Sequence, residues 1–309
     1  MKKDYCALSF SEKERICENI FAANGPYWHL YTDGTNMQEI FCTEQDFDIG
    51  MWILAGSTCT SDAKLITFEL MGNHLHLILS GKVESCLTAF DLFRSRLKRV
   101  MRNNGRIINW KAFKANILPI KSLKDLRNEI IYTNRNAYVA SPKYTPDSYP
   151  WGGGCAFFNA WLKALPLTDF NKLSIDKRRE LTHSRDISKY DRLKTIGNKV
   201  FIPSFCDINL GESLFADART YFSSLTRNAE SFSMIAERLQ DSIFLTDEEI
   251  YAITAAHVKK EYNVERPGLL SPKQKLDCAR HLKIKYNATR QQIRRILRIE
   301  DSILSELFP

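Results

Sequence analysis

Residues 64–81 read KLITFELMGNHLHLILSG, two runs of strand-forming residues on either side of Gly72-Asn73. A Gly-Asn pair between such runs predicts a tight hairpin, with one long bulged strand as the alternative. Side chains alternate along a strand, so His74 and His76 share one face and the leucines beside them share the other. Two neutral imidazoles at this spacing are suited to hold a divalent metal ion. The alternative is a sheet surface that carries two histidines by chance.

Apolar spacing and capping residues predict further elements around this hairpin. Over 83–103, apolar residues recur every three or four positions from Leu87 to Met101, which predicts an amphipathic helix. The other elements predicted near the hairpin are strands over 27–32 and 113–120 and helices over 8–23, 44–58 and 123–139. Strands interleaved with helices in this order predict an α+β fold, in which a mostly antiparallel sheet carries helices on one face.

Composition narrows the class of protein. The 309 residues carry a net charge of +8 with a pI near 9.0, which favours a polyanionic partner such as nucleic acid. No apolar run reaches the ~20 residues of a membrane span, and the amino-terminal sequence lacks the apolar segment of a secretory signal. We therefore expect a soluble, cytoplasmic protein with no membrane partner. The eight cysteines are scattered without a Cys-x-x-Cys pair, which predicts reduced thiols.

The chain divides into three predicted segments. Residues 1–150 hold the predicted sheet and its helices. Residues 151–245 follow a stretch rich in proline and glycine and are predicted to be a linker and an accessory, mostly helical region. Residues 246–309 are predicted to be a compact helical domain.

The segment 246–309 predicts a helix-turn-helix-like domain, because short helices follow one another through tight turns. From Lys273 to Arg298 it has nine Lys or Arg residues against Asp277 alone, which favours DNA over a protein partner. The expected recognition helix, 301–308, has two acids and no base, which counts against strong sequence readout. The residues predicted to contact DNA here are Arg290, Arg294 and Arg295.

The helix predicted over 83–103 has a purely basic second half. The carboxylates of this helix lie in its first half, so its second half presents only positive charge. This pattern predicts a surface for a phosphate backbone, with a solvated helix face as the alternative. These predicted DNA-binding residues are Arg94, Arg96, Lys98, Arg99 and Arg102.

Tyr132 and Asn136 lie four residues apart in the helix predicted over 123–139, and therefore one turn apart on the same face. A tyrosine hydroxyl is a nucleophile for covalent catalysis, and an asparagine carbonyl oxygen suits Mg²⁺ or Mn²⁺. The alternative is a polar stripe on a surface helix.

These features occur in an ordered set of segments: YWHLYTDGTNMQEIF, the histidine strand ELMGNHLHLIL, the basic helix, IIYTNRNAYV and SYPW. In order and approximate spacing, residues from about 26 to 151 resemble the single-tyrosine HUH transposases, most closely the REP-associated tyrosine transposase branch. The sequence departs from the family at Gly72, where a proline is usual, and at Asn134 and Ala137, where the family has histidine and proline.

The resemblance implies a ferredoxin-like or RRM-like HUH domain that cleaves and transfers single-stranded DNA near hairpins. It implies that His74, His76 and Asn136 hold one Mg²⁺ or Mn²⁺ ion, and that Tyr132 attacks the phosphodiester to leave a 5′-phosphotyrosine link and a free 3′-hydroxyl. Family members include dimers and monomers, so a homodimer is compatible with the resemblance.

Several assignments have alternatives. Glu69 and Glu129 are alternative third metal ligands, ranked below Asn136. Trp28 and Trp151, and also Tyr31, could stack on bases, although the two tryptophans suit a core equally well. For the whole protein the alternatives are a domesticated, non-cleaving DNA-binding protein or transcription regulator, an RNA-binding module, and a plasmid-type relaxase or replication initiator.

Overall fold

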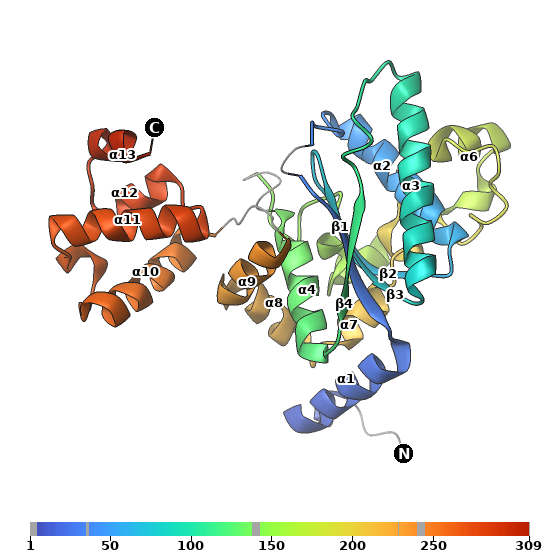
Figure 1. Ribbon diagram of the computed structural model, residues 1–309. Coiled ribbons are helices and arrows are strands. Elements are labelled where there is room, and N and C mark those ends of the chain that lie inside the picture. Colours follow the sequence, from blue (N-terminus) through green and yellow to red (C-terminus); the bar gives the residue numbers. More distant parts are fainter. Residues whose placement is uncertain (1–4, 35–36, 138–142, 228, 240–244, 309) are drawn as a thin grey trace. The chain divides into compact units, whose positions relative to one another are not determined.

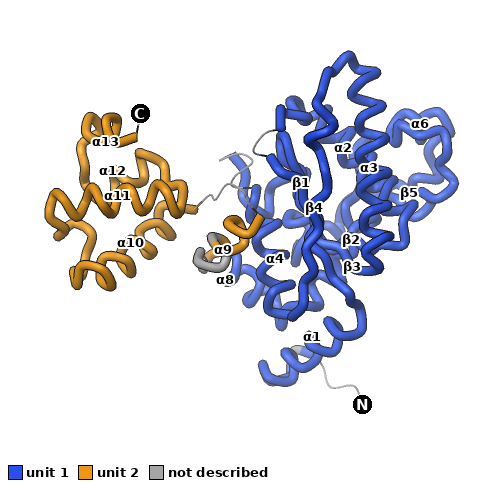
Figure 2. The backbone as a smooth tube through the Cα atoms, in the orientation of Figure 1, with its two compact units in different colours: residues 1–225 blue, residues 226–309 orange. Residues whose placement is uncertain are grey.

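The computed structural model describes residues 5–34, 37–137, 143–227, 229–239 and 245–308. The chain forms two compact units, residues 1–225 and 226–309, which are coloured separately in Figure 2. Residues 151–225, predicted to be a linker and accessory region, therefore pack within the first unit. In the described part of the chain, no helix combines the length and apolar character that a bilayer span requires.

A four-stranded antiparallel sheet forms the centre of the first unit (Figure 1). Its strands, in the order β2-β3-β1-β4, are β2 (Lys64–Leu70), β3 (Leu75–Ser80), β1 (Tyr27–Thr32) and β4 (Ala115–Ile120). The predicted hairpin is present, because β2 and β3 pair and the Met71 N–H donates to the His74 carbonyl oxygen at 2.9 Å. In this register Glu69 and Tyr31 lie on either side of His76, so all three share one face of the sheet.

Helices cover both faces of the sheet, and the prediction of helices on one face is wrong in this respect. Helices α2 (Glu44–Thr60) and α3 (Val83–Asn103) pack together on one face, where Gly50 of α2 lies against Leu70. Helix α4 (Leu123–Arg135) lies on the other face, where Glu129 contacts His29 (Figure 1). The cause is the buried apolar stripe of α4, which requires a sheet face that α2 and α3 leave uncovered.

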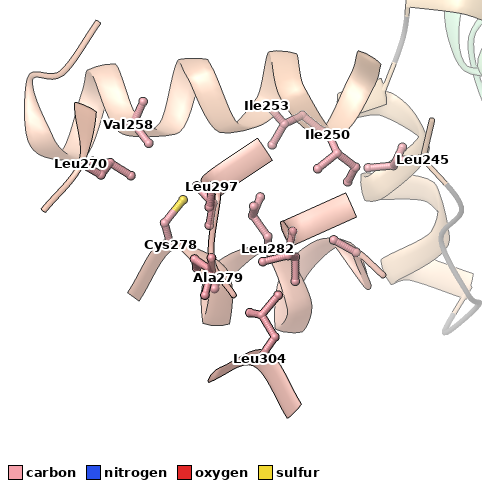
Figure 3. Packing of buried hydrophobic residues seen from close by; sticks show 13 residues of the cluster. Leu245, Ile250, Ile253, Val258, Leu270, Cys278, Ala279, Leu282, Leu297 and Leu304 are labelled. Carbon is pink, nitrogen blue, oxygen red and sulfur yellow. The ribbon is translucent and has the colours of Figure 1, made fainter. Parts of the chain in front are cut away.

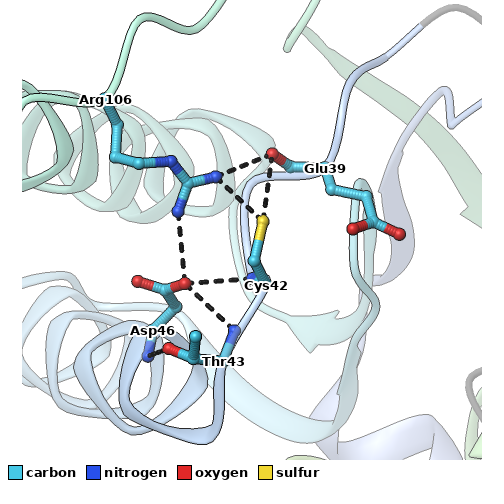
Figure 4. Close-up of polar contacts among 5 residues, drawn as sticks. All are labelled: Glu39, Cys42, Thr43, Asp46 and Arg106. Carbon is cyan, nitrogen blue, oxygen red and sulfur yellow. Dashed lines mark hydrogen bonds and ion pairs between the residues drawn. The ribbon is translucent and has the colours of Figure 1, made fainter.

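The start of α2 is fixed by a polar network that joins it to the loop after α3 (Figure 4). Thr43 caps the helix by accepting a hydrogen bond from the Asp46 N–H, and the Asp46 carboxylate accepts from the N–H groups of Cys42 and Thr43. Arg106 then donates to Asp46 Oδ2 at 3.2 Å and to the Glu39 carbonyl oxygen at 3.0 Å. This capping box therefore also anchors the loop after α3.

The segment after residue 148 lies along the outer edge of β2. The Tyr149 hydroxyl donates to the Leu70 carbonyl oxygen at 2.6 Å, and the Leu70 N–H donates to the Trp151 carbonyl oxygen at 3.0 Å. Gly152 forms an isolated bridge with Glu69. This docking covers an edge strand that would otherwise expose unpaired backbone groups.

The rest of the first unit consists of short elements around this centre. A second, three-stranded sheet has the order β5-β6-β7. The elements are η1 (Tyr5–Ala7), α1 (Phe10–Asn24), η2 (Gly153–Ala156), η3 (Ala160–Ala164), β5 (Thr168–Asp169), η4 (Phe170–Lys172), α6 (Ile175–Thr182), β6 (Lys194–Ile196), β7 (Lys199–Val200), η5 (Ile202–Ser204), α7 (Ile208–Ser213) and α8 (Ala218–Arg227). The seven cysteines whose side chains are described are free thiols.

The second unit is helical. Its elements are α9 (Ala229–Leu239), α10 (Asp247–Tyr262), η6 (Pro267–Leu269), α11 (Pro272–Tyr286), α12 (Arg290–Leu297) and α13 (Asp301–Leu307). Thr246, Ser271 and Thr289 each form a capping box at the start of α10, α11 and α12. Buried residues such as Leu282 and Leu304 form a shared core for α10 to α13 (Figure 3).

Candidate functional site

Three of the residues predicted to act together, His74, His76 and Tyr132, lie close to one another where α4 covers the sheet. The ring centroids of His74 and His76 lie 5.2 Å apart, with the rings nearly perpendicular. The ring of Tyr132, on α4, lies edge-on to that of His76 at 5.6 Å. The structure therefore brings the histidine pair and the predicted nucleophile together, from elements that are 56 residues apart in the chain.

Hydrogen bonds around Asn73 fix which nitrogen of His74 carries a proton. The Asn73 amide nitrogen donates to the carbonyl oxygens of Gly34 and Met37 at 2.8 and 3.1 Å, so its oxygen is the atom that faces His74 Nδ1, at 2.7 Å. An amide oxygen can only accept, so His74 Nδ1 donates. In the neutral ring the lone pair then belongs to Nε2, which is buried.

His76 is held through its Nδ1 atom, which lies across the ring from Nε2. Its Nδ1 atom lies 3.0 Å from Nε2 of His29, and Nδ1 of His29 lies 2.7 Å from Oε2 of Glu129. All three residues are buried. The sequence predicts Glu129 only as an alternative third ligand, and no sequence motif singles out His29. Alternation along β1 could have selected it, because His29 and Tyr31 share a face.

Tyr132 and Asn136 lie at the end of α4. Tyr132 is only 4% exposed. Asn136 is the C-cap residue, and its N–H donates to the Thr133 carbonyl oxygen at 3.2 Å, which tightens the last turn. The predicted helix runs to 139, but residues 138 and 139 lie outside the described part of the chain. The amide nitrogen of Asn136 is buried and has no hydrogen-bond acceptor among the described residues.

Glu69 is a buried carboxyl beside this group. It lies opposite His76 on the neighbouring strand. Its Oε1 atom is buried and accepts no hydrogen bond from the described residues. Burial raises the pKa of the Glu69 carboxyl well above its ordinary value. In the absence of a cation, the neutral acid is therefore favoured.

Whether these residues could hold a divalent ion depends on the donor atoms that they offer. Within the described residues, no group of three or more His, Cys, Asp or Glu side chains is arranged to hold a metal. A site here therefore needs the two imidazole nitrogens together with the Asn136 amide. Rotating that amide by 180° exchanges its buried nitrogen for an oxygen, which is a suitable ligand. By chemical type, two imidazole nitrogens and an amide oxygen are donors that Mg²⁺ or Mn²⁺ accepts.

Asn134, where the resembled family has histidine, has a structural role. Its oxygen accepts from the Thr67 hydroxyl at 2.5 Å, and its nitrogen donates to the Tyr221 hydroxyl at 2.8 Å. These bonds join α4 to β2 and α8. Ala137 is buried, so it contributes to packing at this position.

The basic residues of α3 lie across the sheet from Tyr132, because α3 covers the opposite face. Arg94 donates to the Trp110 carbonyl oxygen, Arg96 to the Tyr190 hydroxyl and Arg99 to the His183 carbonyl oxygen, at 2.5, 2.5 and 3.0 Å. Arg94 and Arg96 are half-buried and hold neighbouring segments in place, whereas Lys98, Arg99 and Arg102 are exposed. The structure does not bring these side chains to the candidate site.

The predicted DNA contacts of the second unit are all exposed on α12. Arg295 forms an ion pair with Asp247 at 2.5 Å, and Arg290 donates to the Ser305 hydroxyl at 3.2 Å. Arg294 lies on the same short helix.

The aromatic residues predicted to stack on bases differ in exposure. Trp151 is 5% exposed, stacks on Phe47 with ring centroids 4.5 Å apart, and donates to Asp48 at 3.0 Å. It is a core residue. Trp28 is half-buried and donates to the Gly81 carbonyl oxygen, and Tyr31 lies parallel to the His76 ring at 6.3 Å.

Comparisons of this chain with protein-family models, with curated proteins and with solved structures find no match.

Proposed function

We propose that this protein is a metal-dependent, single-stranded DNA endonuclease and strand transferase of the single-tyrosine HUH type. The observation that carries the proposal is the contact between Tyr132 on α4 and His76 on β3, whose ring centroids lie 5.6 Å apart. Support also comes from the β-α-β-β-α-β order of the first unit and from its strand order, which are those of a ferredoxin-like domain.

In this proposal Tyr132 is the nucleophile. Its phenolic oxygen attacks the scissile phosphorus in line, the bond from phosphorus to the 3′-oxygen breaks, and the DNA 5′-phosphate remains on the tyrosine. The phenol loses its proton, and the leaving 3′-oxygen gains one. Reversal of the step with another 3′-hydroxyl joins new DNA ends, so no external energy source is required.

His74, His76 and Asn136 would hold Mg²⁺ or Mn²⁺ in this proposal. A bound divalent ion polarises the phosphodiester and offsets the charge that develops on it. The protein contributes two imidazoles whose Nδ1 atoms are already engaged, by Asn73 and by His29. Their orientation is therefore fixed before a ligand arrives.

The second unit would bind DNA as a helix-turn-helix-like module. Helices α12 and α13 are separated by three residues, the first of which, Arg298, has a left-handed backbone with φ of 53°. That tight turn and the basic α12 support the proposal. Because α13 has acids and no base, we expect contacts to phosphates rather than strong readout of bases.

A second candidate function is a non-cleaving DNA-binding protein of the same fold. The burial of Tyr132 favours it, because a nucleophile must reach its phosphodiester. The structure offers less support for the RNA-binding alternative. That alternative required an exposed aromatic sheet face, but His29 and Leu30, which point to opposite faces of β1, are both 0% exposed.

A covalent adduct assay tests the proposal. The full chain is mixed with labelled single-stranded hairpin oligonucleotides with varied flanks, in Mg²⁺ or Mn²⁺, and separated under denaturing conditions. We expect an adduct that EDTA abolishes, that Tyr132→Phe does not form, and that Tyr251→Phe, at an exposed tyrosine of the second unit, still forms. Absence of an adduct on every hairpin supports the non-cleaving candidate, and an adduct with Tyr132→Phe excludes this nucleophile.

A further inference from the structure

We propose that Glu129 and His29 are positioning residues that determine which ring nitrogen of His76 carries the proton and so leave its Nε2 atom as the electron-pair donor. This inference rests on the proposed function in giving that donor a metal ion to bind. The observation is a continuous buried line of two hydrogen bonds, 2.7 Å from Glu129 Oε2 to His29 Nδ1 and 3.0 Å from His29 Nε2 to His76 Nδ1.

The direction of this line follows from donor and acceptor chemistry. With Glu129 ionised, its carboxylate can only accept, so the proton between Glu129 and His29 then lies on His29 Nδ1. A neutral imidazole has one donor and one acceptor, so His29 Nε2 accepts. Nδ1 of His76 must then donate, and in a neutral ring its lone pair belongs to Nε2.

The opposite arrangement makes a different prediction. If His29 carried protons on both ring nitrogens, its Nε2 would donate to His76 Nδ1, and the proton of His76 would lie on Nε2. That atom would then be closed to a metal. With His29 neutral, the one buried negative charge of this group is that of the Glu129 carboxylate. A cation bound at His76 Nε2 would balance it.

The arrangement also fixes the plane of the His76 ring. His29 and Glu129 are 0% and 2% exposed, and they come from β1 and α4, two elements that pack on β3 from different sides. His74 has an equivalent support in Asn73, which comes from the hairpin turn. The two histidines are thus oriented by separate parts of the fold.

The test is nitrogen-15 NMR of the histidine rings in the full chain at pH 8, above the ordinary pKa of histidine of about 6.5, with and without Mg²⁺. We expect the His76 proton on Nδ1 when Mg²⁺ is present. A proton on Nε2 under that condition overturns the proposal. A proton on Nδ1 in a protein that forms no DNA adduct upholds the positioning role while the proposed function fails, so the two outcomes are distinguishable.

Variants provide the second measurement. His29→Phe removes the acceptor, so we expect His76 to populate both tautomers and the Mn²⁺ dissociation constant, measured by titration, to rise about 10- to 100-fold. Glu129→Gln should weaken Mn²⁺ binding less, because its amide oxygen can still accept from His29. Glu69→Gln is the control for the His76 tautomer. Glu69 is also a buried carboxyl beside His76 but is not part of the hydrogen bonds from Glu129 to His76, so this variant should leave the proton on Nδ1. Unchanged tautomer and Mn²⁺ affinity in His29→Phe would contradict the proposal.

Discussion

The backbone at Gly152 passes so close to the Glu69 carboxylate that a side chain at position 152 would overlap Glu69 Oε2. The contact holds the segment after residue 148 against β2, at the edge of the candidate site. Glycine is required here by space, because any Cβ would have to displace a fully buried group.

We therefore expect Gly152→Ala to destabilise the first unit by about 1–3 kcal/mol, the usual cost of overpacking a filled interior. Urea unfolding followed by tryptophan fluorescence measures it. The matched control is Gly72→Ala, where the nearest atom to a new Cβ lies 3.7 Å away, and it should change stability by less than about 0.5 kcal/mol. Equal effects of the two substitutions would contradict the packing argument.

Glu69 itself gives a prediction with a defined sign. Its folded-state pKa is raised by burial, so its contribution to stability is fully present below the ordinary pKa and is lost as pH rises through the folded-state value. Glu69→Gln removes this loss. We expect the variant to gain stability relative to wild type as pH rises from 4 to 8, measured by urea unfolding at each pH. A difference that does not change with pH would refute the assignment.

The histidines of the second unit predict the opposite pH dependence. His257 and His281 stack in parallel at 3.9 Å between α10 and α11. Burial lowers the pKa of both histidines. The charge of Lys285 also lowers the pKa of both, and that of Lys260 lowers the pKa of His257, whereas the charge of Glu261 raises the pKa of both. A histidine whose pKa is lowered in the folded state contributes stability that is fully present above about pH 6.5, its ordinary pKa. This contribution is lost as pH falls through the folded-state pKa.

We therefore expect amide protection in α10 and α11 to decrease at pH 5.5 relative to pH 7.5, after correction for intrinsic exchange. Hydrogen exchange with mass spectrometry measures it peptide by peptide. His281→Phe keeps an aromatic ring but removes one titrating group, so the decrease should be smaller in that variant. The same decrease in wild type and variant would show that the stacked pair is not its source.

Trp151 and Trp161 provide a matched pair for the distinction between core and surface. Trp151 is 5% exposed and Trp161 is 82% exposed. Trp151→Ala should cost about 3–5 kcal/mol because it leaves a cavity, and Trp161→Ala less than about 0.5 kcal/mol. Thermal unfolding of each variant measures this difference and shows whether Trp151 is a core residue. If Trp151 were instead a base-stacking platform, Trp151→Ala would weaken DNA binding and leave stability unchanged.

Local elements of this protein were predictable from the sequence because they depend on neighbours in the chain. The strand Tyr27–Thr32 and the helix Val83–Asn103 begin and end where an aromatic, β-branched run and the apolar spacing place them. Thr43, Thr246 and Thr289 cap helices that begin where capping residues indicate, since capping involves residues only three positions apart. The side-by-side histidines and the Tyr132–Asn136 spacing have the same local origin.

What only the tertiary structure decided are the relationships between elements. Helical periodicity shows that α3 and α4 each have one apolar face, but not which face of the sheet each covers. The sheet separates them, so the basic residues of α3 lie away from Tyr132. The link from Glu129 through His29 to His76 joins residues up to 100 positions apart in the chain. Such contacts depend on strand order and packing, which no local pattern encodes.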